Sequence, residues 1–268
     1  MNFDGQTVWI TGASSGIGAA LAPAFSRAGA AVILSGRRAD ALAEIAQACS
    51  GPTLMLPFEA TDYSALPAIV AAAAAWRGGI DVLVNNAGIS QRSLAVDTGF
   101  EVYRTIMEVD FFAPLRLTQL VFPAMLTRGR GRIVSIASVA GKLGSPLRTG
   151  YCAAKHAVVG YSDALRAEVE HAGISVHVVT PGFVRTPIAH RALSGDGSEH
   201  GRVDDNIEGG ISAEEAADII LAGVAAGTRE IPVGRGAEME ALRLRTADPE
   251  RLFDLVAGHG KVLAAVRH

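Results

Sequence analysis

Thr7-Val8-Trp9-Ile10-Thr11-Gly12-Ala13-Ser14-Ser15-Gly16-Ile17-Gly18 is the stretch that best predicts the fold. Its first five residues form an apolar run typical of a buried strand, and an Ala-rich helical pattern begins at Ile17. The three glycines between them permit a tight turn, close approach of the backbone to a pyrophosphate, and close helix packing. The stretch predicts a strand, an anion-binding turn and a helix, although a glycine-rich loop without a ligand is the alternative.

The rest of the chain repeats this alternation of a short apolar run with a longer amphipathic segment. The predicted strands are residues 7–11, 31–35, 53–56, 82–84, 133–137, 175–180 and 230–233. The predicted helices are residues 17–28, 39–48, 63–76, 100–126, 151–171 and 216–226, followed by two short C-terminal helices at 237–245 and 249–259. Repeated βαβ units predict an α/β fold, a doubly wound parallel sheet of the Rossmann type.

Length and composition favour one domain over residues 1–268, because 268 residues with 49% apolar content can bury a large core. The polar, glycine-rich segment 194–201 predicts a substrate lid within about 183–211 that is mobile without ligand. Residues from about 235 to 268 form a helical extension that either closes the pocket or meets a second subunit.

Charge and cysteine content narrow the class of protein. A formal net charge of −3 does not favour nucleic acid or an anionic membrane as partner. Cys49 and Cys152 lack metal-ligand spacing, so we expect no metal site and a reducing compartment. The N-terminus does not resemble a signal peptide, and the longest apolar run, 69–76, is too short to span a bilayer. We therefore expect a cytoplasmic protein without a membrane partner.

Tyr151 and Lys155 are the candidate catalytic pair. Side chains at i and i+4 share a helix face, so the Lys155 ammonium can stabilise the phenolate form of Tyr151. Tyr151 could then exchange a proton with a carbonyl or alcohol oxygen, and Ser138, at the end of an apolar run, could donate a hydrogen bond to that oxygen. A half-buried Tyr beside a solvated Lys is the alternative for this spacing alone.

Gly36-Arg37-Arg38 follows the second predicted strand, about 20 residues past the glycine turn. An acidic residue that binds a ribose hydroxyl is expected there in NAD-binding chains. Two guanidiniums can instead bind a 2′-phosphate, so the sequence favours NADP(H) over NAD(H). The alternative is a solvated Arg pair at a helix start.

Five segments, 11–18, 85–88, Ser138, 151–155 and 181–186, together resemble the short-chain dehydrogenase/reductase family in order and spacing. The resemblance covers nearly the whole chain. It implies Ser138 as carbonyl-oxygen donor, Tyr151 as proton donor, and Lys155 as ligand of the nicotinamide ribose. It also implies a homodimer or homotetramer built on helices near Phe111 and Ala157.

The predicted cofactor-binding residues are Gly12, Ser14, Ser15, Gly16, Ile17, Gly18, Arg37, Arg38, Glu59, Ala60, Asn86, Ala87, Gly88, Tyr151, Lys155, Pro181, Gly182, Val184 and Thr186. Among them, the resemblance implies that Asn86, Val184 and Thr186 contact the nicotinamide side.

Two positions depart from the family pattern. Asp110 stands where the family often has an Asn that holds a water linking Lys to solvent. We include Asp110 with Ser138, Tyr151 and Lys155 as a catalytic candidate, because an ionised Asp near Lys155 can preserve a relay in altered form. The alternative is a mid-helix acid without a catalytic role. Glu59 stands where the family more usually has an Asp near the adenine.

Two sets of residues are candidates for the substrate pocket. An apolar wall would suit a hydrophobic ketone or aldehyde and would comprise Val139, Leu143, Leu147, Phe183 and Ile188. A polar or acidic substrate would instead meet Gln91, Arg92, Arg148, His190 and Arg191, which are otherwise solvated loop residues.

The sequence thus predicts an NADP(H)-dependent oxidoreductase that transfers a hydride between nicotinamide and a carbonyl or secondary alcohol of a hydrophobic small molecule. A non-catalytic NADPH-binding redox sensor is the alternative, disfavoured by the complete set of Ser138, Tyr151 and Lys155. A structural subunit without cofactor is disfavoured by the intact glycine turn.

Overall fold

The computed structural model describes residues 3–202 and 205–265. Parts of three predictions lie outside these residues: 1–2 of the N-terminus, 203–204 of the lid, and 266–268 of the C-terminal extension.

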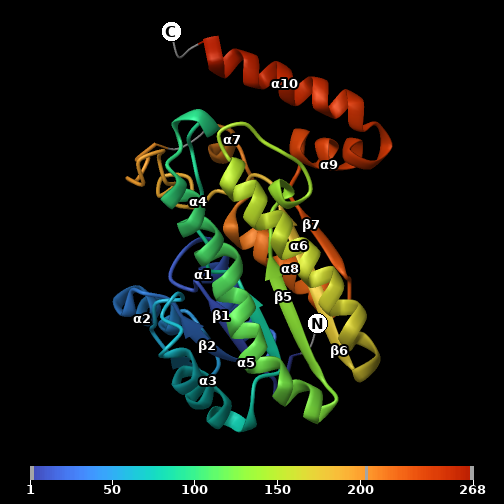
Figure 1. The fold of residues 1–268 in the computed structure, drawn as a ribbon. Helices are drawn as coiled ribbons and strands as arrows, with labels where there is room; N and C mark the ends of the chain where they lie inside the picture. Colours follow the sequence, from blue (N-terminus) through green and yellow to red (C-terminus); the bar gives the residue numbers. More distant parts are fainter. Residues whose placement is uncertain (1–2, 203–204, 266–268) are drawn as a thin grey trace.

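A parallel sheet of seven strands runs through the molecule (Figure 1), in the order β3-β2-β1-β4-β5-β6-β7. The strands are β1 (Thr7–Thr11), β2 (Ala31–Ser35), β3 (Thr53–Met55), β4 (Val82–Asn85), β5 (Gly131–Ile136), β6 (Ile174–Pro181) and β7 (Glu230–Val233). Every neighbouring pair is parallel, from Thr11 beside Ser35 to Pro181 beside Val233. The predicted doubly wound parallel sheet is therefore confirmed.

Helices cover both faces of the sheet. The layers comprise α1 (Gly16–Arg27), α2 (Ala39–Gln47) and α8 (Ala213–Ala225) on one side, and α3 (Leu66–Ala75), α5 (Ala113–Arg128) and α6 (Thr149–Val169) on the other. The other described helices are α4 (Phe100–Met107), α7 (Asp205–Glu208), α9 (Ala237–Ala247) and α10 (Pro249–Ala265). Short 3-10 turns are η1 (Trp76–Gly78), η2 (Ala95–Asp97), η4 (Val139–Gly141) and η5 (Glu170–Ala172), and η3 (Glu108–Phe112) is a π turn.

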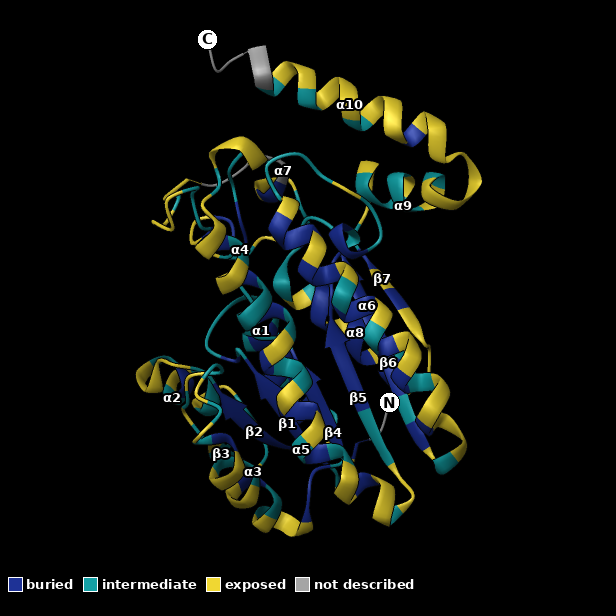
Figure 2. Ribbon diagram, viewed as in Figure 1, coloured by how far each residue is buried: buried dark blue, intermediate teal, exposed yellow. Residues whose placement is uncertain are grey.

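The two-residue period of the strands divides the core into two layers. Val8 and Ile10 point to the side covered by α1, α2 and α8, whereas Trp9 between them packs with residues of α3, α5 and α6. Figure 2 shows the consequence: β1, β2 and β4 are buried along their whole length, whereas the helices that cover the sheet expose their outer surfaces. Because the sheet is covered on both faces, its strands read as continuous apolar runs.

The segment Phe100–Arg128 is one continuous helical stretch, long and apolar enough by length and composition to cross a membrane. In the fold α5 packs against β4, β5 and α3, as a core helix of the sheet does. The sequence predicted one helix over 100–126, but the stretch contains the π turn η3 at its middle. Asp110 lies in that turn.

The C-terminal helices α9 and α10 lie beyond the carboxyl end of the sheet (Figure 1). Leu252 of α10 is buried, whereas Phe253, Leu255 and Val262 are exposed. In α9 the Glu238 carboxylate accepts a hydrogen bond from Phe183 N at 3.2 Å. The extension therefore contacts the loop that follows β6.

The strand order reverses between β1 and β4, which are hydrogen-bonded neighbours in the sheet. In open α/β sheets, ligands bind in the crevice outside the carboxyl ends of the strands at such a point. The turn after Thr11 and the loop after Asn85 both begin there.

Two glycines that precede β5 and β6 differ in how closely they are packed. Gly129 and Gly173 both have left-handed backbones, with φ of 62° and 82°. A Cβ on Gly173 would lie 2.2 Å from Gly129 O, whereas a Cβ on Gly129 would meet nothing within 4 Å. We expect Gly129→Ala to lower the free energy of unfolding by about 1 kcal/mol through backbone strain alone. Gly173→Ala should lose roughly 1–3 kcal/mol more because a backbone carbonyl must move.

Urea denaturation of both variants measures this difference. Equal losses would show that the carbonyl at residue 129 relaxes without cost.

Candidate active site

The glycine turn is held against the loop after β4 by close packing. A Cβ on Gly12 would lie 2.8 Å from Ala87 Cα, and one on Gly18 would lie 2.4 Å from Asn86 Nδ2. Gly12 and Gly16 also have positive φ, 65° and 57°. Each of these positions therefore requires glycine for local reasons, before any ligand is considered.

Thr11 and Asn86 fix the two sides of the crevice to each other. Thr11 Oγ1 accepts hydrogen bonds from the backbone N–H of Asn86, at 3.0 Å, and of Ala87, at 3.1 Å. The Asn86 amide in turn donates to Thr11 O, at 2.9 Å, and Gly12 O, at 3.2 Å. The amide of Asn86 is thus used within the protein.

The N-terminus of α1 fits the pyrophosphate of a dinucleotide. Ser15 is the N-cap residue, but its side chain makes no capping hydrogen bond, and the first turn of α1 has no acidic residue. The first backbone N–H groups of a helix lack partners within it and carry partial positive charge. Because residues of this turn line the cavity described next, an anion bound there can accept hydrogen bonds from these donors.

A cavity of about 430 Å³ extends from this turn along the carboxyl ends of the strands. That volume is ordinary for a small-molecule or cofactor site. It is lined by Ser138 and by all the predicted cofactor-binding residues except Gly18, namely Gly12, Ser14, Ser15, Gly16, Ile17, Arg37, Arg38, Glu59, Ala60, Asn86, Ala87, Gly88, Tyr151, Lys155, Pro181, Gly182, Val184 and Thr186. Gly18 lies beneath the turn, against Gly12 O and Asn86. Asp110 does not line this cavity.

Arg37 and Arg38 lie at the end of the cavity next to β2. Arg38 Nη2 donates to Ser14 O at 2.9 Å, which places its guanidinium beside the glycine turn. Arg37 forms a 3.8 Å ion pair with Glu59, and both of these side chains are largely exposed. An exposed pair of this kind contributes little free energy, so a bound anion can displace it.

Ser138 and Tyr151 both line the cavity. Ser138 Oγ accepts from Ala140 N at 3.2 Å and donates to Pro181 O at 3.3 Å, which links the ends of β5 and β6. Tyr151 is 7% exposed and packs with Ala140 and Cys152. The turn that carries Ser138 is therefore in contact with the helix that carries Tyr151.

Lys155 is buried behind Tyr151 and is held at three points. Its Nζ lies 5.6 Å from the centre of the Tyr151 ring, donates to Ile136 O at 3.2 Å, and lies 3.2 Å from Asp110 Oδ2. The other oxygen of Asp110 accepts from Ile89 N at 2.8 Å. Both charged side chains are at most 5% exposed, so this is a buried ion pair.

Burial and charge act in opposite directions on this pair. Burial raises the pKa of Asp110, and attraction to Lys155 offsets this only in part. Burial alone would lower the pKa of Lys155, but the carboxylate of Asp110 and then Tyr151 outweigh it, so that pKa is raised. Lys155 therefore keeps its ammonium charge well above neutral pH.

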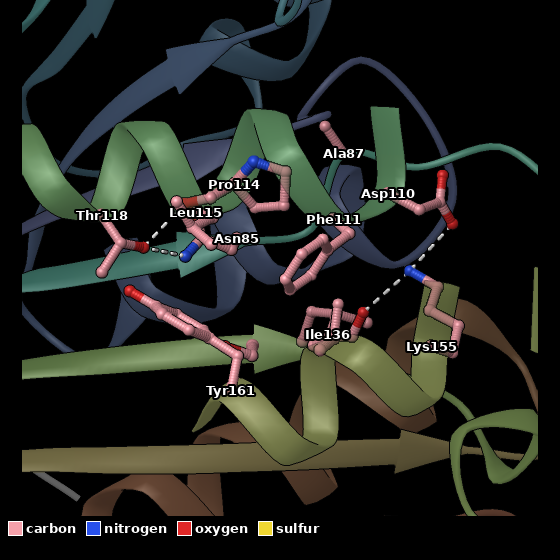
Figure 3. Close-up of a pocket in the computed structure, with 12 residues that line it drawn as sticks. Asn85, Ala87, Asp110, Phe111, Pro114, Leu115, Thr118, Ile136, Lys155 and Tyr161 are labelled. Carbon is pink, nitrogen blue, oxygen red and sulfur yellow. Dashed lines mark hydrogen bonds and ion pairs between the residues drawn. The ribbon is translucent and has the colours of Figure 1, made fainter. Parts of the chain in front are cut away.

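A second, much smaller cavity lies behind the pair (Figure 3). Its volume of about 10 Å³ corresponds to roughly one water molecule. Figure 3 shows Lys155 between Asp110 and Ile136 at one end, and Asn85 with Thr118 at the other. Among the described residues, Asn85 Oδ1 and Asp110 Oδ2 are two of three buried side-chain atoms that accept or donate no regular hydrogen bond. This cavity thus has polar groups at both ends.

The π turn η3 places Asp110 at this position. Single π turns inside α-helices widen the helix by one residue and are frequent at functional sites. Gly88 also packs closely here: a Cβ on it would lie 3.3 Å from both Asp110 Oδ2 and Lys155 Nζ. Gly88 therefore leaves room for the ion pair.

The substrate end of the large cavity combines apolar and basic residues. Phe183 and Ile188 of the predicted apolar wall line it, with Ile89, Leu193 and Ile207, but Val139, Leu143 and Leu147 do not. Of the predicted polar set, Arg148 and Arg191 line it, whereas Arg92 and His190 do not. Gln91 is fully buried and does not line the cavity.

Three contributors to the site were missed from the sequence. They are the Thr11 hydroxyl, the carbonyl of Ile136 and the N–H of Ile89. The last two are backbone groups, for which residue type carries no signal. Thr11 could have been noticed as a polar residue that ends an apolar strand.

Sequence comparison identifies proteins that this chain resembles. The family model described as short chain dehydrogenase matches residues 6–196. The chain is 38% identical over 261 residues to mouse dehydrogenase/reductase SDR family member 7B, covering 95% of this chain and 81% of that protein. It is also 38% identical to a dehydrogenase/reductase SDR family protein 7-like of Anopheles gambiae, covering 94% and 82%.

Solved structures agree with this assignment. A short-chain dehydrogenase/reductase from Burkholderia phymatum, in complex with NAD, aligns with a TM-score of 0.82 at 25% identity, covering 93% of this chain and 96% of that one. A short-chain dehydrogenase from Streptomyces avermitilis aligns with a TM-score of 0.78 at 28% identity, covering 99% and 95%. The chain therefore belongs to the short-chain dehydrogenase/reductase family and is an NAD(P)-dependent oxidoreductase.

Proposed function

We propose that this oxidoreductase uses NADP(H) and interconverts a carbonyl and a secondary alcohol on a predominantly hydrophobic small molecule. The observation that carries the proposal is the meeting of Ser138, Tyr151 and Lys155 at one end of a cavity whose other end holds the glycine turn. A cofactor-binding regulator would have no use for all three side chains in one place, so the sensor alternative is disfavoured.

The protein supplies positioning and proton transfer, whereas the bound nicotinamide supplies the hydride. In the reductive direction the Ser138 hydroxyl donates a hydrogen bond to the carbonyl oxygen and orients it. Tyr151 donates its phenolic proton to the same oxygen as charge develops there. The Lys155 ammonium stabilises the phenolate that remains.

Asp110 keeps Lys155 in this position and connects it to the small cavity. The carboxylate holds the ammonium from behind, while Ile136 O fixes its direction. We assign to Asp110 a positioning and relay role, in which protons reach Lys155 through the cavity shared with Asn85 and Thr118.

The preference for NADP(H) rests on Arg37 and Arg38. Both line the cavity directly after Gly36, and no acidic residue stands at the end of β2. The Arg38 guanidinium lies next to the glycine turn, where an adenosine 2′-phosphate would be within reach of it.

The remaining parts of the proposal concern substrate and partners. Ile89, Phe183 and Ile188 favour an apolar body for the substrate, and Arg148 and Arg191 allow an anionic group on it. We propose a cytoplasmic homodimer or homotetramer without nucleic acid or membrane partners. The 45% exposure of Phe112, next to Phe111, supports an interface at that helix.

Replacing Tyr151 tests the reaction. Tyr151→Phe should lower kcat by about 10³-fold, because one proton donor is worth roughly 10²–10⁴, and should leave NADPH binding unchanged. NADPH oxidation with aliphatic, aromatic, steroid-like and sugar carbonyls measures the rate, and fluorescence measures binding. Tyr63→Phe is the matched control, since Tyr63 donates to Glu108 and does not line the cavity. Full activity in Tyr151→Phe would refute the mechanism.

Replacing Arg38 tests the cofactor. Arg38→Ala should weaken NADPH binding about tenfold or more, since hydrogen bonds to charged groups contribute about 1.5–3 kcal/mol, and should leave NADH binding nearly unchanged. Titration of both nucleotides checks this, with Arg37→Ala in parallel. Arg104→Ala, an exposed arginine paired with Glu101 on α4, controls for loss of surface charge. Equal weakening of NADH and NADPH would contradict the 2′-phosphate assignment.

Replacing Asp110 tests the buried pair. Asp110→Asn removes the carboxylate that outweighs the cost of burying Lys155, so the pKa of Lys155 falls. Because Lys155 must be charged to stabilise the phenolate that forms during reduction, the pH above which kcat declines should move down. Complete pH profiles of kcat for both proteins measure the shift. Identical profiles and equal kcat would remove Asp110 from the mechanism.

A further inference from the structure

Gln91 is a buried amide that makes contacts on both of its ends. Its side chain has no exposed surface, although the residue lies in the loop after β4. The oxygen Oε1 accepts a hydrogen bond from Gly150 N at 2.7 Å. The nitrogen Nε2 donates to Thr98 Oγ1 at 3.0 Å and to Ser93 Oγ at 3.1 Å. Gln91 therefore joins its own loop to the first turn of α6.

The first turn of α6 needs such a partner. Helices begin with backbone N–H groups that lack intrahelical acceptors, and a side chain at the N-cap position usually supplies one. Here the N-cap residue is Arg148, which makes no capping hydrogen bond with its side chain. Gln91 supplies the missing acceptor from a segment about 60 positions earlier in the chain.

The contact leaves no room for a side chain at position 150. A Cβ there would lie 2.9 Å from Gln91 Oε1 and 3.0 Å from Tyr103 Cδ1. Gly150 thus permits the amide of Gln91 to reach the helix directly before Tyr151. Because Gly150 is bonded directly to Tyr151, a displacement of Gly150 also displaces Tyr151.

The loop that carries Gln91 also makes hydrogen bonds to two other segments. One contains the strained residue Leu147, and the other contains Leu193, which lines the cavity. Ser93 N donates to the carbonyl of Leu147, which has a left-handed φ of 66° that a branched side chain rarely adopts. The backbone of Gln91 pairs with Leu193, whose N–H donates to Ser90 O at 2.8 Å. Gln91 therefore contacts both α6, through Gly150, and the segment around Leu193.

We propose that Gln91 is a positioning residue: it caps α6 from outside and sets the place of Tyr151 relative to Ser138. Asp110 and Ile136 hold Lys155 one turn further along, so loss of the cap moves Tyr151 while Lys155 stays fixed. Catalysis then falls, whereas the glycine turn and cofactor binding are unaffected.

Three variants separate positioning from stability. Gln91→Leu removes both polar ends with little change in volume, and Gln91→Glu keeps an oxygen for Gly150 N. Thr98→Val, the matched control, leaves the bond to Gly150 N in place and removes the contacts of Thr98 Oγ1 with Gln91 Nε2, Ser93 Oγ and Leu94 O. Hydrogen exchange of the peptide that contains Gly150, NADPH binding, Tm, kcat and KM are measured for each. Gln91→Met replaces Gln91→Leu should the latter fail to fold.

We expect Gln91→Leu to speed amide exchange at Gly150 at least tenfold and to lower kcat at least tenfold, with the NADPH Kd within twofold of the unmodified protein. Gln91→Glu should restore slow exchange and kcat to within threefold. Thr98→Val should lower Tm but leave amide exchange at Gly150 and kcat unchanged. Unchanged exchange in Gln91→Leu, or an equal fall of kcat in Thr98→Val, would overturn the proposal.

The kinetic measurement rests on the proposed reductase function, but the exchange measurement does not. Should no substrate be turned over, exchange at Gly150 and its rescue by Gln91→Glu decide the assignment of Gln91 alone.

Discussion

The contact between the ends of β1 and β4 is the constraint on which the site depends. Thr11 and Asn86 exchange hydrogen bonds through side chain and backbone across the reversal of strand order. This contact closes the floor of the crevice and leaves the helix donors of α1 facing outward. The glycines at 12 and 18 are consequences of it, because the amide of Asn86 and the backbone of Ala87 occupy the space that side chains would take.

The catalytic end is organised by a different force, the cost of burying charge. Lys155 is almost completely enclosed, and a lone ammonium there would be expensive to desolvate. Asp110, Ile136 O and the Tyr151 ring together compensate for that cost. Since removing one member of a buried pair leaves the other uncompensated, Asp110 and Lys155 belong together energetically as well as geometrically.

Much of this molecule is predictable from its sequence because its signals are local. Strand period, glycine spacing and the i, i+4 relation of Tyr151 and Lys155 each depend on neighbours in the chain. The π turn at Asp110 was not predictable, since a helix of 3.6 residues per turn fits the same apolar pattern. Gln91 was expected in solvent or against substrate, and only tertiary packing shows that it is buried against α6. Backbone acceptors such as Ile136 O leave no trace in residue type.

Glu238 links the residue types that are allowed at two positions far apart in the sequence. Its carboxylate binds Phe183 N, and a Cβ on Gly182 would lie 2.2 Å from Glu238 Cγ. Position 182 can therefore accept a larger residue only when position 238 carries a shorter one. A side chain introduced at position 182, in the loop after β6, is therefore expected to need a compensating change at position 238 of α9.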